Sequence, residues 1–150
     1  MPLSGVVFLG MLPVTLIVPA LKKLLVDRFA ASPFWPHAFM SINLIGGIAA
    51  APLRVRLSSR GRQRRRVIVG AFLVDAMLLG AMAVLPSLTA VLIARFFEGA
   101  AHLLAITRLM ALAADWATSG NRGRVMGMLG AAIMFGTACG THVGGLAWQA

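Results

Sequence analysis

The chain has 150 residues, of which 59% are apolar and 12% are charged, and its mean hydropathy is +0.88. Soluble domains carry about 25% charged residues, so this composition excludes an ordinary soluble globule. The formal net charge of +10 suits nucleic-acid binding in a soluble protein, but the positions of the charges favour a different explanation.

Five apolar runs predict membrane-spanning helices, because crossing a bilayer takes about 20 largely apolar residues. They use nearly the whole chain, so no soluble domain is expected. The first run has no basic residue before it and is interpreted as a retained helix, with Pro13 and Pro19 expected to kink it. The sequence therefore predicts an all-α integral membrane protein with about five transmembrane helices. The predicted spans are residues 4–21, 34–53, 67–85, 88–107 and 125–147.

Arginine positions predict the orientation of these spans. The connector 54–66, RVRLSSRGRQRRR, carries seven arginines and no acid, and Arg122 and Arg124 precede the last span. The positive-inside rule makes both connectors cytoplasmic, although the basic connector 22–28 is then a mild exception outside. We expect a multi-pass protein of a bacterial-type inner membrane with a cytoplasmic N-terminus and an external C-terminus. No aromatic residue interleaves the arginines, so the bilayer and not nucleic acid is the expected partner.

Ionisable residues inside the spans are the candidate functional residues. The run 88–107 contains Arg95, Glu98 and His102, which fall within roughly 60° of one another at about 100° per residue. An Arg or Glu at bilayer depth costs about 2.5 to 3.5 kcal/mol, so this stripe is expected to face other helices or a wet cavity. Asp75, near the middle of the third span, lies at a similar depth. Together the four residues predict a proton-coupling and substrate cavity.

Other interpretations of these four residues stay open. Arg95 and Glu98 can form a pair that only neutralises both groups during insertion. His102 and Asp75 can each be buried groups that hydrogen-bond to a neighbouring helix and carry no proton for transport.

The stretch LIARFFEGAA resembles a fourth-helix motif of the major facilitator superfamily of secondary transporters, Arg-x-x-Gln-Gly. Arg95 and Gly99 are in register with the motif, and Glu98 stands at the Gln position. The resemblance implies that Arg95 takes part in proton coupling.

The last span contains GTACGTHVGG, which is similar to the superfamily's antiporter motif Gly-x-x-x-Gly-Pro-x-x-Gly-Gly. Thr141 replaces the proline. Glycines four residues apart form a flat face on which another helix can pack closely. The matched residues are Gly136, Gly140, Gly144 and Gly145.

The basic connector resembles the superfamily's cytoplasmic loop signature, a Gly-x-Leu-Ala-Asp-Arg-x-Gly-Arg-Arg run. Arg60, Gly61 and Arg62 are its best matches. The signature's leading glycine and its aspartate are missing, which weakens its usual role as a latch between the two halves of a transporter.

The resemblance implies the incomplete N-terminal half of a major facilitator fold, since members have about twelve helices in two halves. The expected function is proton-coupled efflux of small hydrophobic or cationic compounds by a protein of which this chain is a truncated part. Substrate and protons would be its partners once the missing half is present. No cofactor, metal site or enzyme chemistry is expected, because no phosphate-binding loop, metal-ligand spacing or activated nucleophile occurs in the sequence.

Two further functions stay open. In the first alternative, the chain is a non-transporting small membrane protein or gene remnant that acts only through helix packing, which includes association of helices into an oligomer. A compact multidrug exporter assembled from short chains is the second alternative, but such exporters carry a carboxylate in their first helix and this chain does not.

Overall fold

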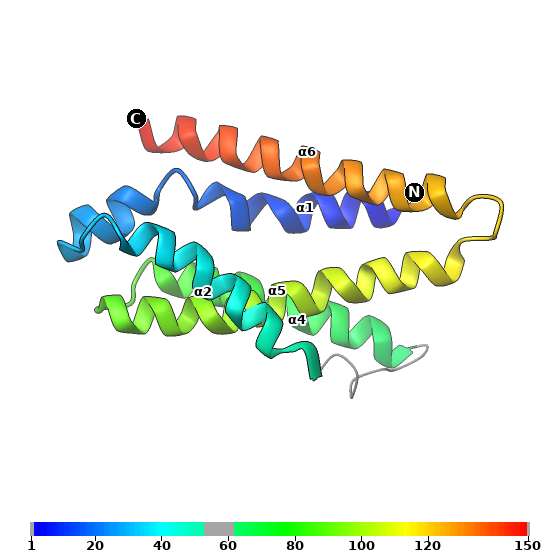
Figure 1. Ribbon diagram of the computed structural model, residues 1–150, viewed down its shortest axis with the longest axis horizontal. Coiled ribbons are helices and arrows are strands. Elements are labelled where there is room, and N and C mark those ends of the chain that lie inside the picture. Colours follow the sequence, from blue (N-terminus) through cyan, green and yellow to red (C-terminus); the bar gives the residue numbers. More distant parts are fainter. Residues whose placement is uncertain (1, 53–61, 150) are drawn as a thin grey trace. The chain divides into compact units, whose positions relative to one another are not determined.

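The computed structural model describes residues 2–52 and 62–149, and these residues form helices and connecting turns with no strand (Figure 1). The prediction of an all-α chain is confirmed. The predicted loop residues Arg60 and Gly61 lie outside the described residues, and Arg62 is the first residue of α4. The helices are α1 (Pro2–Leu16), the short π-helix η1 (Lys22–Asp27), α2 (Trp35–Ala49), α4 (Arg62–Met82), α5 (Leu88–Trp116) and α6 (Arg122–Gln149).

Two helices among the described residues are long and apolar enough to cross a membrane, namely α5 and the part of α6 from Arg122 to Ala147. The apolar helix at the N-terminus is shorter, and α2 has 15 residues, a length of about 22 Å at 1.5 Å per residue. The arginines that begin α4 lower its mean hydropathy. The count of five spans therefore stays a prediction.

Local sequence explains where the helix ends differ from the predicted spans. The first span was expected to run to residue 21, but α1 ends at Leu16 and turns follow before η1. Pro19 has no N–H to donate and disfavours the α conformation at Val18. By contrast α5 continues nine residues past the predicted Thr107 to Trp116, because Leu, Met and Ala, which favour helix, dominate that segment.

The described chain forms two compact units. The first contains Met1–Ala20 and Ile106–Ala150, and the second contains Leu21–Ala105.

In the first unit, α1 and α6 lie side by side and run in the same direction (Figure 1). Three glycines of α6 contact α1. Successive glycines meet α1 residues that are also successively later in the sequence, as expected for parallel helices. A Cβ on Gly136 would lie 2.8 Å from the Phe8 carbonyl oxygen, and one on Gly140 would lie 2.7 Å from that of Leu12. The predicted glycine face is thus in contact with α1 of the same chain.

The glycines at the end of this motif differ in their surroundings. A Cβ on Gly144 would collide with the Leu16 carbonyl oxygen, whereas a Cβ on Gly145 would meet nothing within 4 Å. Gly145 therefore lies outside the contact that Gly136, Gly140 and Gly144 make.

This difference gives a matched test of the α1–α6 contact. We expect Gly144→Ala to destabilise the protein by about 1 to 3 kcal/mol, because the backbone of α1 must move away. Gly145→Ala is expected to be nearly neutral. The measurement is the melting temperature of the purified protein in detergent, followed by size-exclusion chromatography after heating. Equal melting temperatures for the two variants would contradict the packing described.

In the second unit, α2 and α5 approach so closely that only glycine fits where they cross. A Cβ on Gly46 of α2 would collide with the Phe96 carbonyl oxygen, and a Cβ on Gly99 of α5 would collide with that of Asn43. The two backbones are therefore in direct contact, which brings the polar side chain of Asn43 against the middle of α5.

The end of α4 is held by an arginine from outside the helix. Arg28 donates hydrogen bonds to the carbonyl oxygens of Ala83 and Leu85, both at 2.8 Å, and to that of Met82 at 3.3 Å. The last carbonyls of a helix have no partner within it. The guanidinium donates to that of Met82, the last residue of α4, and to those of Ala83 and Leu85 directly after the helix. Ala30 then adopts a positive φ of 51° that ends the preceding helical segment.

Candidate functional site

The stripe predicted on α5 is buried in the structure. The exposed fractions are 1% for Arg95, 0% for Glu98 and 5% for His102. The three residues lie one turn apart on the same face of the helix, as 3.6 residues per turn requires. Buried ionisable groups are stable only when they are paired or hydrogen-bonded, so their partners define the site.

Glu98 is held by two donors that both reach the same oxygen. Arg95 Nη1 donates to Glu98 Oε2 at 2.6 Å, and Asn43 Nδ2 on α2 donates to the same oxygen at 2.7 Å. The first bond is a salt bridge between two fully buried side chains. The glycine contact between α2 and α5 makes the second bond possible, since it brings Asn43 within reach of Glu98.

Arg95 also lies against an aromatic ring. Its guanidinium carbon is 4.5 Å from the centroid of Phe39, which is fully buried on α2. A guanidinium over a ring at this distance gains cation–π attraction, and the gain is larger where water is excluded. Phe39 thus stabilises the charged Arg95 in addition to Glu98.

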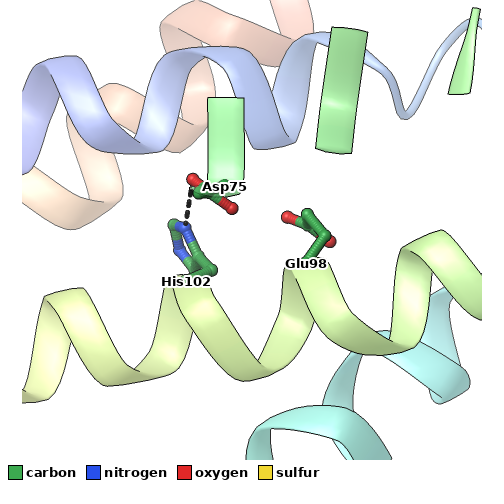
Figure 2. Close-up of side chains that lie close together, drawn as sticks. All are labelled: Asp75, Glu98 and His102. Atoms are coloured by element: carbon green, nitrogen blue, oxygen red, sulfur yellow. Dashed lines mark hydrogen bonds and ion pairs between the residues drawn. The ribbon is translucent and has the colours of Figure 1, made fainter. Parts of the chain in front are cut away.

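A second pair lies beside the first and joins α5 to α4. His102 Nδ1 is 3.3 Å from Asp75 Oδ2, and Asp75 is 2% exposed. The dashed line in Figure 2 marks this contact. One ligand-type atom from each of Asp75, Glu98 and His102 lies within 4.8 Å of the others. The sequence placed Asp75 and Glu98 at similar depth, and the fold brings both into one site.

Two carboxylate oxygens in this site have no donor. Among the described residues, no hydrogen-bond partner reaches Asp75 Oδ1 or Glu98 Oε1, although both atoms are buried. Figure 2 shows an oxygen of Glu98 facing Asp75. Buried acceptors that lack a partner carry a desolvation cost of about 1 to 3 kcal/mol each, so the site has capacity for a further positive or donating group.

The chemistry of that further group is limited by the charges already present. Two carboxylates and an imidazole are ligand types that transition metals accept. However, Arg95 already balances one of the two carboxylates, so a divalent ion would leave a net positive charge in a buried site. One proton would leave the site neutral with His102 uncharged, which is the less costly state in a low dielectric.

The fold brings the four predicted site residues together and adds two residues that the sequence did not predict. Arg95, Glu98, His102 and Asp75 lie together, and Asn43 and Phe39 join them without having been predicted. Asn43 was visible as an amide inside an apolar run, and Phe39 lies one turn before it on the same face. The predicted packing glycines Gly136, Gly140 and Gly144 belong to the other compact unit, and Gly99 lies at the crossing with α2.

The family model of the Major Facilitator Superfamily matches residues 3–150. The chain belongs to this superfamily. Members are transporters, so the apolar helices and the family together make this a membrane protein of a transporter family. The resemblance of the α5 and α6 motifs to superfamily motifs is consistent with that membership. No curated protein and no solved structure matches the chain.

The hydrogen bond from Asn43 gives a test of the site's geometry in this superfamily member. We expect Asn43→Ala to lower the free energy of unfolding by about 1 kcal/mol, the usual scale of an interhelical hydrogen bond in a membrane. Titration of the protein in mixed micelles with dodecyl sulfate, followed by tryptophan fluorescence, measures this change.

Ser41 on the same helix provides the control. Its exposed hydroxyl donates to the His37 carbonyl of its own helix, at 3.1 Å, and to no other group among the residues that the structure describes, so Ser41→Ala should leave the unfolding midpoint unchanged. An equal loss of stability in both variants would mean that Asn43 does not hold Glu98.

Proposed function

We propose that this chain provides the proton-coupling site of a secondary transporter that exports small hydrophobic or cationic compounds in exchange for protons. The observation that carries the proposal is the buried Arg95–Glu98 pair, with Asp75 and His102 beside it. Intramembrane ionisable residues of this kind typically mark ion or proton pathways. Glu98 binds and releases the proton, and Arg95 sets how readily it does so.

The parallel run of α1 and α6 supports the predicted topology. Two parallel helices that start on the same side of a membrane require an odd number of crossings between them, and α2, α4 and α5 supply three. We infer five spans, with the N-terminus and the arginine-rich connector on the cytoplasmic side and the end of α6 outside. The membrane would be a bacterial-type inner membrane.

The arrangement of the glycine face bears on the packing-only alternative. In that alternative the glycines of α6 would bind a partner helix, either in another protein or in a second copy of the chain. Gly136, Gly140 and Gly144 already contact α1 of this chain. Their packing role therefore needs no partner, which favours the transport proposal.

Proton release on binding of a cation tests the proposal. We expect tetraphenylphosphonium, added to the purified chain in lipid nanodiscs in weakly buffered solution, to release protons that a pH indicator dye detects. The physical reason is that a cation bound near Glu98 and Asp75 favours the ionised form of their carboxyl groups. Binding of the cation is measured in parallel by isothermal titration calorimetry.

Variants assign the release to the site. Glu98→Gln should abolish the release, because the amide binds no proton, and Arg95→Ala should reduce it by changing the charge beside Glu98. Ser41→Ala, with its exposed hydroxyl on α2, should release as many protons as the unmodified protein. Cation binding without any proton release, or release that Glu98→Gln leaves unchanged, would refute proton coupling at this site.

A further inference from the structure

The two carboxylate oxygens of the site that accept no hydrogen bond from the described residues lie on different helices. Asp75 Oδ1 belongs to α4 and Glu98 Oε1 to α5, and both are buried. The second oxygen of each carboxyl group is already occupied, in Asp75 by His102 and in Glu98 by Arg95 and Asn43. The free oxygen of each group is therefore the one left to interact across the gap that Figure 2 shows.

The charged groups around this gap do not balance. From α5 the site receives Arg95, Glu98 and His102, from α4 it receives Asp75, and from α2 it receives the uncharged Asn43 and Phe39. His37 of α2 is exposed and lies outside the site. With His102 uncharged, two carboxylates face one guanidinium, which leaves one excess negative charge in a buried position.

We propose that Asp75 and Glu98 hold one proton between them, so that the proton site of this transporter is an acid pair across α4 and α5 and not Glu98 alone. A proton on either carboxyl group creates an O–H that donates to the free oxygen of the other. One proton is thus bound to one of the two oxygens and hydrogen-bonded to the other, and it cancels the excess negative charge. On release it leaves to water, and both carboxylates become ionised. This inference deepens the proposed function and rests on it for its role in transport.

Carboxylate pairs that share a site cannot both ionise easily, because like charges a few ångströms apart repel strongly in a low dielectric. The pair then titrates as a unit, and its proton belongs to neither residue alone. This behaviour separates the inference from a mechanism in which Glu98 binds the proton and Asp75 only accepts a hydrogen bond from His102.

Isotope-edited infrared spectroscopy tests the sharing in the unmodified protein. Glu98 is the only glutamate of the chain, so carboxyl-labelled glutamate marks this residue alone. The purified protein in nanodiscs is titrated with acid, and the carbonyl band of the protonated carboxyl group is followed. If the proton is shared, labelled glutamate and labelled aspartate each shift part of that band. Labelled aspartate also marks Asp27 and Asp115, so its part of the band is assigned to Asp75 by comparison with Asp75→Asn. A band that shifts with labelled glutamate only, or an aspartate part that Asp75→Asn retains, would overturn the inference.

Two isosteric variants extend the test. Asp75→Asn and Glu98→Gln should each remove the band in the pH range where the unmodified protein titrates, because the remaining carboxylate keeps its own cationic or donating partner and stays ionised. Ser41→Ala should keep the band. The exposed Asp27 and Asp115 are present in all variants and are subtracted as a common background. A band that persists in Asp75→Asn would place the proton on Glu98 alone, and one that persists in Glu98→Gln would place it on Asp75 alone.

The outcomes separate this inference from the proposed function. Cation-linked proton release that survives Asp75→Asn but is lost in Glu98→Gln would overturn the sharing and leave proton coupling in place. A shared infrared band in a protein that releases no protons on cation binding would support the pair and refute its role in export.

Discussion

The burial of a full positive charge, Arg95, in the N-terminal half of α5 is the constraint on which this site depends. A guanidinium stays protonated in proteins, so every group around it must compensate for lost water. Glu98 supplies the counter-charge, Asn43 a second donor to the same oxygen, and Phe39 a ring face. Removing one partner of such a pair leaves an uncompensated charge, which is far more costly than the pair's own net contribution.

That compensation requires close contact between helices, and glycine provides it. Gly46 and Gly99 let the backbones of α2 and α5 touch, and this contact brings Asn43 and Phe39 onto Arg95 and Glu98. Helices in a bilayer gain no hydrophobic driving force from each other, so close packing and interhelical hydrogen bonds hold them together. In the second unit, the glycine crossing and the polar site are therefore parts of one arrangement.

In the first unit, glycines also allow close packing of two helices, but no polar site lies beside them among the described residues. The contact between α6 and α1 is made by Gly136, Gly140 and Gly144. The α1 residues that they meet are apolar except Thr15, whose hydroxyl donates to carbonyl oxygens of its own helix. A glycine motif thus supports polar chemistry in one unit and plain packing in the other. The difference lies in the neighbouring residues. Ionisable side chains lie at the α5 crossing, whereas none of the described α1 residues that meet these glycines is ionisable.

The sequence by itself determined the helical class, the apolar character and the stripe of Arg95, Glu98 and His102, because helix periodicity places residues three and four apart on one face. It also indicated Asp75 as a buried acid. Only the tertiary structure decided which groups meet. Three features depend on how helices far apart in the sequence cross. They are the pairing of Asp75 with His102, the contacts of the Asn43 amide and the Phe39 ring with the Arg95–Glu98 pair, and the exclusion of Gly145 from the packed face. Local pattern carries no information about that rotation and register, which are set by the fit of whole helix surfaces.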